Sequence, residues 1–282
     1  MSFKPFKTIG IGITFSPNLK ANISEAARLA LFLDAKLVLI HVGEQSKHKE
    51  NTFKTFLKPF IGKQLNYDVV FNVGDPVRVI LSAVNENKIG LLILGALKRE
   101  TFFKYYIGSI ARKITREAKC SVLLLIKPSI KRVPCQHIVV NGLEDPKTRQ
   151  TISTAFYVAK KLSANKITIV EEISQQEVAV NVNDDRSLRR STLVKERLKL
   201  REDTRVKKII NDIPLGVKEN ILINTQPIFG KRGYSIGHYA QVVRADLLVM
   251  NAPTKTTFWD RLFPHDIEHI LTELPTDVLI IR

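Results

Sequence analysis

The chain has 282 residues, of which 44% are hydrophobic and 25% are charged. These proportions are ordinary for globular proteins and exclude a disordered or fibrous chain. Lysine and arginine exceed aspartate and glutamate by a formal net charge of +17, which suits attraction to polyanions such as nucleotides as well as plain solubility.

The sequence shows no sign of a membrane segment, a disulfide framework or a metal site. Its apolar runs are far shorter than the roughly 18 residues that cross a bilayer, and the N-terminus lacks the cleavage site of a signal peptide. Cys120 and Cys135 do not make a disulfide framework. His265 and His269 are four residues apart, but no third ligand of suitable spacing accompanies them. We therefore expect a cytoplasmic protein without a structural metal and without membrane contact.

The first half of the chain alternates short apolar strands with amphipathic helices. Strands are expected at 8–14, 36–42, 68–73, 90–94 and 121–126. Helices are expected at 24–33, 76–87 and 107–118. Strands that alternate with helices, and that are apolar along nearly their whole length, indicate a parallel sheet covered on both faces.

The second half repeats the order of the first. Strands are expected at 137–141, 166–170, 220–224, 246–250 and 277–281, with helices at 148–162, 235–243 and 266–274. The sequence thus predicts an α/β fold with two doubly wound parallel-sheet domains, 1–128 and 137–282. The linker at 127–136 contains two prolines, as domain boundaries often do.

One long segment, 174–214, has no counterpart in the first half. Its centre, 184–208, is crowded with charged residues and carries apolar residues at intervals. The pattern favours an exposed amphipathic helix with many ion pairs. A protein-binding surface and a nucleic-acid arm are the alternatives, and nucleic acid is the less expected partner.

The strongest signal for a ligand site follows the fourth strand. Gly95 comes at the carboxyl end of a buried strand, where doubly wound sheets bind ligands. Gly108 and Ser109 open the next helix, and free amides at a helix N-terminus bind phosphate groups. An ordinary strand turn followed by an ordinary helix cap would look the same.

Taken together, these features resemble a tandem universal stress protein, with two such domains in one chain. The resemblance covers nearly all of 1–128. It is carried by the segment after strand one (13–17), the strand ending at Val42, the turn 74–76, the spacing G-x2-K-x9-G-S from Gly95 to Ser109, and the last strand within 118–128. It is weaker in the second half. Domains of this family often pair through their final strands, so 121–126 and 277–281 are expected to pair within one chain as an intramolecular pseudo-dimer.

The resemblance implies a nucleotide site, from which this sequence departs at two positions. Family members that bind ATP resemble G-x2-G-x9-G-S/T and have an aspartate at the end of strand one. Here Lys98 stands at the second glycine and Thr14 at the aspartate. The lysine could fill the phosphate space or could supply a positive charge to it, and the threonine offers a hydroxyl in place of a carboxylate.

By the same resemblance, ten residues form the candidate nucleotide site. They are Ile13, Thr14 and Val42 beside adenine and ribose, Leu94, Gly95, Leu97 and Lys98 along the sugar-phosphate edge, and Gly108, Ser109 and Ile110 at the phosphates. The second half lacks these residues, because Asn251 and Pro264-His265 replace the glycines and Asn141 replaces the aspartate. We expect no ATP site there.

No catalytic constellation is evident, so an enzyme is not expected. The resemblance implies a cytoplasmic stress-response module that binds or signals, with ATP as its ligand in the first domain. One alternative is a family member that binds a protein partner and no nucleotide. Another is a weak nucleotide hydrolase, against which the absence of an acidic metal ligand at Thr14 counts. The protein partner is not identified by the sequence, and a homodimer of the tandem chain is left open.

Overall fold

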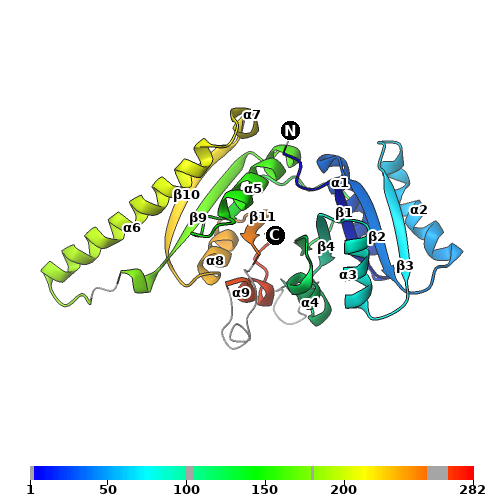
Figure 1. Cartoon of the computed structure of the whole chain (residues 1–282), viewed down its shortest axis with the longest axis horizontal. Coiled ribbons are helices and arrows are strands. Elements are labelled where there is room, and N and C mark those ends of the chain that lie inside the picture. The colour runs from blue at the N-terminus through cyan, green and yellow to red at the C-terminus, as the bar shows by residue number, and fades with distance from the viewer. Residues whose placement is uncertain (1–2, 99–104, 179–180, 253–265) are drawn as a thin grey trace. The chain divides into compact units, whose positions relative to one another are not determined.

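The computed structural model describes residues 3–98, 105–178, 181–252 and 266–282. It forms two compact units (Figure 1). The first comprises Met1–Pro134 together with Leu271–Arg282, and the second comprises Cys135–Ile270. The last residues of the chain belong to the first unit because their strand pairs there.

The first unit is built on a mostly parallel sheet. Its strands are β1 (Thr8–Ile13), β2 (Lys36–Val42), β3 (Tyr67–Asn72), β4 (Leu91–Gly95), β7 (Ser121–Leu125) and β12 (Asp277–Ile281). Within this unit their order is β12-β7-β4-β1-β2-β3. The middle strands are apolar and bury almost every side chain, as strands covered on both faces do.

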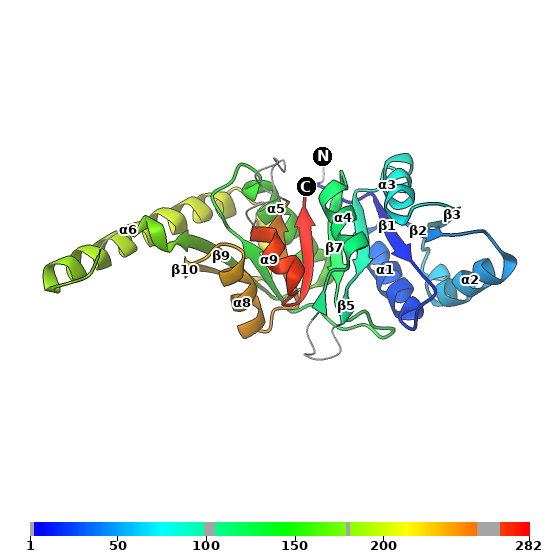
Figure 2. The ribbon, with the colours of Figure 1, turned by 90° about the horizontal axis from the view of Figure 1, so that it is seen from below.

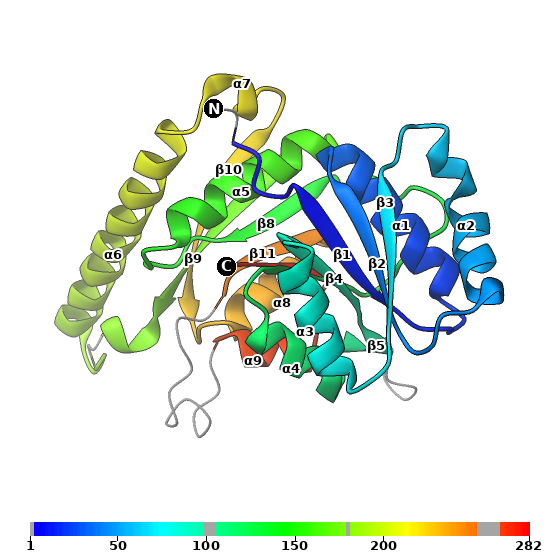
Figure 3. The same ribbon diagram turned by 45° about the vertical axis from the view of Figure 1, so that its right-hand side comes forward.

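Helices cover both faces of this sheet, as expected for a doubly wound fold. Helices α1 (Leu19–Leu33) and α2 (Lys47–Ile61) pack together on one face. Helices α3 (Pro76–Glu86) and α4 (Ser109–Glu117) pack together on the other, and Figure 3 shows the two pairs on opposite sides of β1–β3. The predicted α/β class with a doubly wound parallel sheet is confirmed.

The structure contains elements that the sequence analysis missed. Helix α2 was not predicted, although Phe53, Leu57 and Phe60 lie at helical spacing and are buried on one face. The Ser46 side chain caps it by accepting a hydrogen bond from the Lys49 amide at 3.3 Å. A short antiparallel ribbon, β5 (Leu97–Lys98) with β6 (Tyr105–Tyr106), was also not foreseen.

The predicted pairing of the two final strands is confirmed. Strand β12 runs antiparallel to β7, with Val278 opposite Leu124 and Ile280 opposite Val122. Figure 2 shows the red C-terminal strand lying beside β7. The amide of Ile126 donates to Asp277 Oδ1 at 2.8 Å, which extends the pairing by one contact.

The second unit has its own parallel sheet. Its strands are β8 (His137–Asn141), β9 (Lys166–Ser174), β10 (Leu222–Gly230) and β11 (Leu247–Asn251), in the order β10-β9-β8-β11. Strands β9 and β10 are longer than predicted, and their last residues pair only with each other beyond the end of β8. The remaining elements are α5 (Thr148–Leu162), the 3-10 turn η1 (Gln175–Glu177), α6 (Asp185–Asn211), α7 (Leu215–Lys218), α8 (Tyr234–Val242) and α9 (Asp266–Thr272).

The charged segment of the second half forms the long helix α6. It begins at a capping box, in which Asp184 Oδ1 accepts from the Ser187 amide at 2.7 Å and the Ser187 hydroxyl accepts from the Asp184 amide at 3.0 Å. Val206 and Ile209 are buried on its inner side, and α6 contacts β9 and β10. No helix within the described ranges is both long enough and apolar enough to span a membrane.

Candidate functional site

The predicted site lies at the point in the first sheet where the order of strand addition reverses. From β1 the chain moves to β2 and β3 on one side, then returns to place β4 on the other side of β1. Ile11 pairs with Ile93 of β4, while Ile13 pairs with His41 of β2. Ligands of doubly wound sheets bind beyond the carboxyl ends of the strands at such a crossing. Thr14, the residue after β1, and Gly95, the last residue of β4, are both exposed at this edge.

Asn22 is a polar residue at this edge that the sequence analysis missed. A Cβ placed on Gly95 would lie 3.8 Å from both Asn22 side-chain amide atoms, so the amide faces the end of β4. Asn22 Oδ1 is buried and has no hydrogen-bond partner among the described residues. An unsatisfied carbonyl oxygen in such a position is a ready acceptor for a ligand or a water. A lone asparagine in the first turn of a helix gave no signal in the sequence.

The phosphate end of the predicted site is the N-terminus of α4. Gly108 is the N-cap residue, with φ −63° and ψ 162°, and no side chain caps the helix there. The first backbone bond of the helix runs from the Arg112 amide to the Gly108 carbonyl at 2.9 Å. The amides of the residues between them therefore have no partner within the helix. Ser109 and Ile110 are exposed at this end, and the helix dipole favours an anion there.

The ribbon of β5 and β6 carries an apolar side chain to this helix end. A Cβ built on Gly108 would lie 3.0 Å from Leu97 Cδ1, so Leu97 already occupies the space beside the glycine. Leu97 is 51% exposed and is paired with Tyr106, while Lys98 is paired with Tyr105. Any phosphate at this helix end would therefore share space with Leu97.

The other predicted residues form the wall of the edge. Ile13 and Leu94 are 5% exposed and belong to the core, whereas Val42 is half-buried. The structure thus brings together the strand-end residues and the start of α4 at one edge of the sheet. Among the predicted residues whose exposure the structure describes, Thr14, Gly95, Leu97, Ser109 and Ile110 are exposed.

An aromatic cluster stands next to this edge. The ring of His41 lies 5.5 Å from Phe15, 6.0 Å from Phe53 and 5.7 Å from Phe71, measured between centroids. Its Nδ1 lies 3.2 Å from the Ile13 carbonyl oxygen. Burial lowers the pKa of His41 below its usual value, the Ile13 carbonyl opposes this shift, and the Lys49 ammonium adds to it. The neutral ring therefore serves as a packed core group.

The matching edge of the second unit is filled by its own side chains. Asn141 is 2% exposed, and its Oδ1 accepts from the Leu143 amide at 2.8 Å. Arg205 of α6 donates to the Gly142 carbonyl and to Glu202 Oε2, the latter at 2.7 Å. Pro264 and His265 lie outside the described residues. The Arg205 guanidinium of α6 thus lies against the residue that follows β8.

Two adjacent buried glutamates in β9 were not singled out from the sequence. Glu172 is 4% exposed and accepts from the amides of Gly233 and Ile236, at 3.0 and 2.8 Å, at the start of α8. Glu171 is 1% exposed, and neither of its oxygens has a hydrogen-bond partner among the described residues. Burial, followed by the carboxylate of Asp203, raises the pKa of Glu171 to about 7. Adjacent strand residues point to opposite faces, so the two carboxyls meet different surroundings.

Metal binding finds no support in the described part of the chain. No group of three or more His, Cys, Asp or Glu side chains there is placed to hold a metal ion. Of the spaced histidine pair, His265 lies outside the described residues, and His269 Nε2 is buried without a partner.

These features define an α/β protein of the doubly wound class. Residues 44–125 match the model of the Universal stress protein family. The resemblance to that family is thereby confirmed over these residues. No curated protein matches the sequence.

Solved structures extend the likeness in fold to the whole chain. A functionally unknown protein from Pseudomonas aeruginosa PAO1 superimposes with a TM-score of 0.70 at 15% identity, over 99% of this chain and 93% of that one. A universal stress protein from Archaeoglobus fulgidus DSM 4304 gives 0.68 at 14% identity, over 99% of each chain. At these identities the likeness is one of fold, and it includes both units.

Proposed function

We propose that the chain is a stress-response binding module whose first unit binds ATP or a related adenine nucleotide, and that it is not an enzyme. The observation that carries this proposal is the uncapped N-terminus of α4 at Gly108 and Ser109, beside the end of β4 at Gly95. Free helix amides and a strand crossing are the two features with which such sheets hold phosphate groups.

Different residues at this edge contact the phosphates, the ribose and the adenine of the nucleotide. The amides at Ser109 and Ile110, with the Ser109 hydroxyl, take the phosphates. The Thr14 hydroxyl bonds the ribose, and Ile13 and Val42 contact the adenine side. The unsatisfied Asn22 carbonyl beside Gly95 is a further acceptor for a ribose hydroxyl or the adenine amino group.

Two neighbouring residues set the limits of this site. Leu97 lies against Gly108, so the phosphates must displace it or pass beside it. Lys98 follows in β5 and would supply positive charge to the phosphates, as lysine does in other phosphate sites. No carboxylate stands at Thr14 to hold a metal ion beside the nucleotide, which supports binding without hydrolysis.

Calorimetric titration of ATP with Mg²⁺ into the full chain tests the proposal. GTP and inorganic triphosphate serve as controls, because a chain of charge +17 attracts any polyanion and salt weakens that attraction. We expect saturable one-site binding of ATP at moderate salt and far weaker heats with the other two. Absent binding, or equal binding of all three, would overturn the proposal.

A negative charge introduced at the N-terminus of α4 tests directly whether the phosphates bind there. Ser109→Glu places a carboxylate where the phosphate should sit, while the helix dipole tolerates it well. We expect ATP affinity to fall at least about tenfold, the equivalent of about 1.4 kcal/mol. Thr55→Glu adds the same charge on the exposed side of α2 in the same unit and should leave the affinity unchanged. Equal ATP affinity of the two variants would show that the N-terminus of α4 does not bind the phosphates.

The outer side of α6 favours a second candidate function, the binding of an acidic protein partner. Arg186, Arg190 and Arg197 are exposed and lie on one side of the helix, interleaved with the exposed Leu193 and Leu200. Reversal of the three arginines to glutamate should abolish partner binding and leave ATP binding intact. A chain without any nucleotide affinity whose partner is lost on this reversal would identify this candidate as the function.

A further inference from the structure

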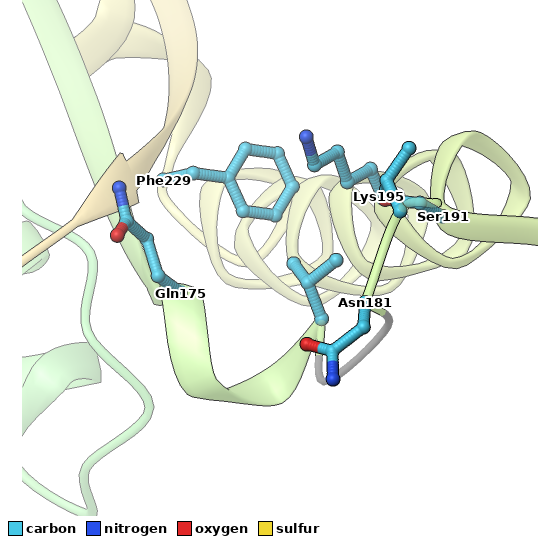
Figure 4. Close-up of a pocket in the computed structure, with 7 residues that line it drawn as sticks. Gln175, Asn181, Ser191, Lys195 and Phe229 are labelled. Carbon is cyan, nitrogen blue, oxygen red and sulfur yellow. The ribbon is translucent and has the colours of Figure 1, made fainter. Parts of the chain in front are cut away.

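The second unit contains a pocket that neither the family match nor the predicted site explains. Its volume is about 430 Å³, within the range of small-molecule sites. It is lined by residues of η1, by Val178, Asn181 and Val182, by the N-terminal half of α6 and by the end of β10 (Figure 4). Helix α6 therefore forms much of the pocket; it joins β9 to β10 as α2 joins β2 to β3 in the first unit, but it has 27 residues where α2 has 15.

One side of the pocket is apolar and aromatic. Phe229, near the end of β10, presents its ring to the pocket, and Val178 and Val182 line it as well. The ammonium groups of Lys195 and Lys199 each lie 6.0 Å from the centroid of the Phe229 ring. An aromatic face and positive charge thus lie side by side at this pocket, at the outer limit of a cation–π contact.

The charge of the pocket is positive and only partly compensated. Lys199 is paired with Glu196 at 2.9 Å. Lys195 has no ion pair with any described residue; its contact is the ring of Phe229. The nearby Glu177 is engaged by Arg201 at 3.1 Å. One ammonium group is thus free to meet one carboxylate.

The polar side of the pocket supplies the remaining groups. Ser191 of α6 is 4% exposed and lines the pocket, and its hydroxyl makes no hydrogen bond within the described ranges. The side-chain amides of Gln175 and Asn181 also line it. A hydroxyl at a pocket wall that has no protein partner can donate to a ligand oxygen within reach.

We propose that this pocket binds a small aromatic carboxylate. The planar ring packs on Phe229 between the two valines, and the carboxylate accepts from the Lys195 ammonium and the Ser191 hydroxyl. A ligand of one or two rings fits the volume, and its single charge matches the single unpaired lysine. The site is separate from the nucleotide edge of the first unit, and its occupancy does not depend on that proposal.

The probe for this site is 1-naphthoate, titrated into the full chain at 150 mM salt and followed by its fluorescence and by calorimetry. We expect saturable binding with one site per chain. Naphthalene-1-carboxamide, which keeps the rings and lacks the charge, should bind at least tenfold more weakly. No saturable binding of 1-naphthoate, or equal affinity for the amide, would overturn the proposal.

Matched variants localise the binding. Lys195→Gln should weaken 1-naphthoate at least tenfold, and Arg197→Gln removes the same charge two residues away on the outer side of α6 and should have no effect. Phe229→Leu keeps an apolar side chain at this half-buried position and should also weaken binding at least tenfold. Ser109→Glu should leave 1-naphthoate binding unchanged, which separates this test from that of the nucleotide site. Equal affinity of the Lys195 and Arg197 variants would place the probe elsewhere and refute the assignment.

Discussion

At the scale of single residues, Glu171 makes the stability of the protein depend on pH. Its carboxyl titrates at about 7 in the folded chain, against 4.5 ordinarily, because burial disfavours the charge. Between these values the folded state holds a proton that the unfolded state has lost, so stability falls as pH rises from about 4.5 to about 7. The full cost, at most about 3 kcal/mol, is present above pH 7.

Glu171→Gln removes this titration. We expect the variant to match the native chain near pH 4.5 and to become progressively more stable than it up to pH 8, as measured by urea unfolding at each pH. Glu172→Gln is the matched control, because Glu172 binds the amides at the start of α8. It should lose about 1–2 kcal/mol near neutral pH. Parallel pH profiles of the native chain and Glu171→Gln would contradict the assignment.

The two cysteines should differ sharply in reactivity. Burial raises the pKa of the Cys120 thiol to about 11, whereas Cys135 is only half-buried. The thiolate is the reactive form, so iodoacetamide at pH 8 should label Cys135 readily and Cys120 only after unfolding. Peptide mass spectrometry measures both rates in one sample. Equal rates in the folded chain would show that β7 and its surroundings open far more often than the packing implies.

At the scale of elements, β5 places the side chain of Leu97 against the start of α4. Leu97→Ala should tighten ATP binding about fivefold, or about 1 kcal/mol, because it removes the side chain that lies against Gly108. The stability cost should be small, since Leu97 is half exposed. Val73→Ala, at a 71% exposed valine of the same unit, is the control and should leave affinity unchanged. Weaker ATP binding in Leu97→Ala would mean that Leu97 contacts the nucleotide.

Most elements could be predicted because their signals are local. The bounds of β2, β8, α5 and β12 agree with those expected from strand composition and helical periodicity. Helix α2 was missed because lysines and Pro59 obscure the spacing of its three buried residues. Strands β9 and β10 run further than expected because their ends are held only by each other, a long-range pairing that no local pattern encodes.

Only the part of the candidate site formed by glycines and by the start of a helix could be predicted from the sequence. The sequence placed Gly95, Gly108 and Ser109 at one edge because strand ends and helix starts converge there in such sheets. It could not place Asn22 or the side chain of Leu97, since both reach the edge through packing between distant segments. The pocket beside Phe229 was equally hidden, because it depends on where α6 docks on β10.

At the scale of the whole molecule, the last strand of the chain completes the sheet that the first residues begin. Ile280 is 2% exposed and pairs with Val122 of β7. Ile280→Asp buries a carboxylate in this sheet, which costs several kcal/mol. The damage should therefore appear first in the first unit, far away in sequence. Hydrogen exchange followed by mass spectrometry should show protection lost in peptides that contain β7 and β4.

The matched control for this prediction is Leu222→Asp, which places the same group at a 60% exposed position of β10 in the second unit. Protection of β7 and β4 should remain native in that variant, because an exposed carboxylate is hydrated and leaves the first sheet intact. If Ile280→Asp left β7 protected and loosened only β8 and β9, the C-terminal strand would contribute nothing to the first unit. Loss of protection in β7 would instead mean that the first unit cannot reach its full stability until the last residue of β12 has been added.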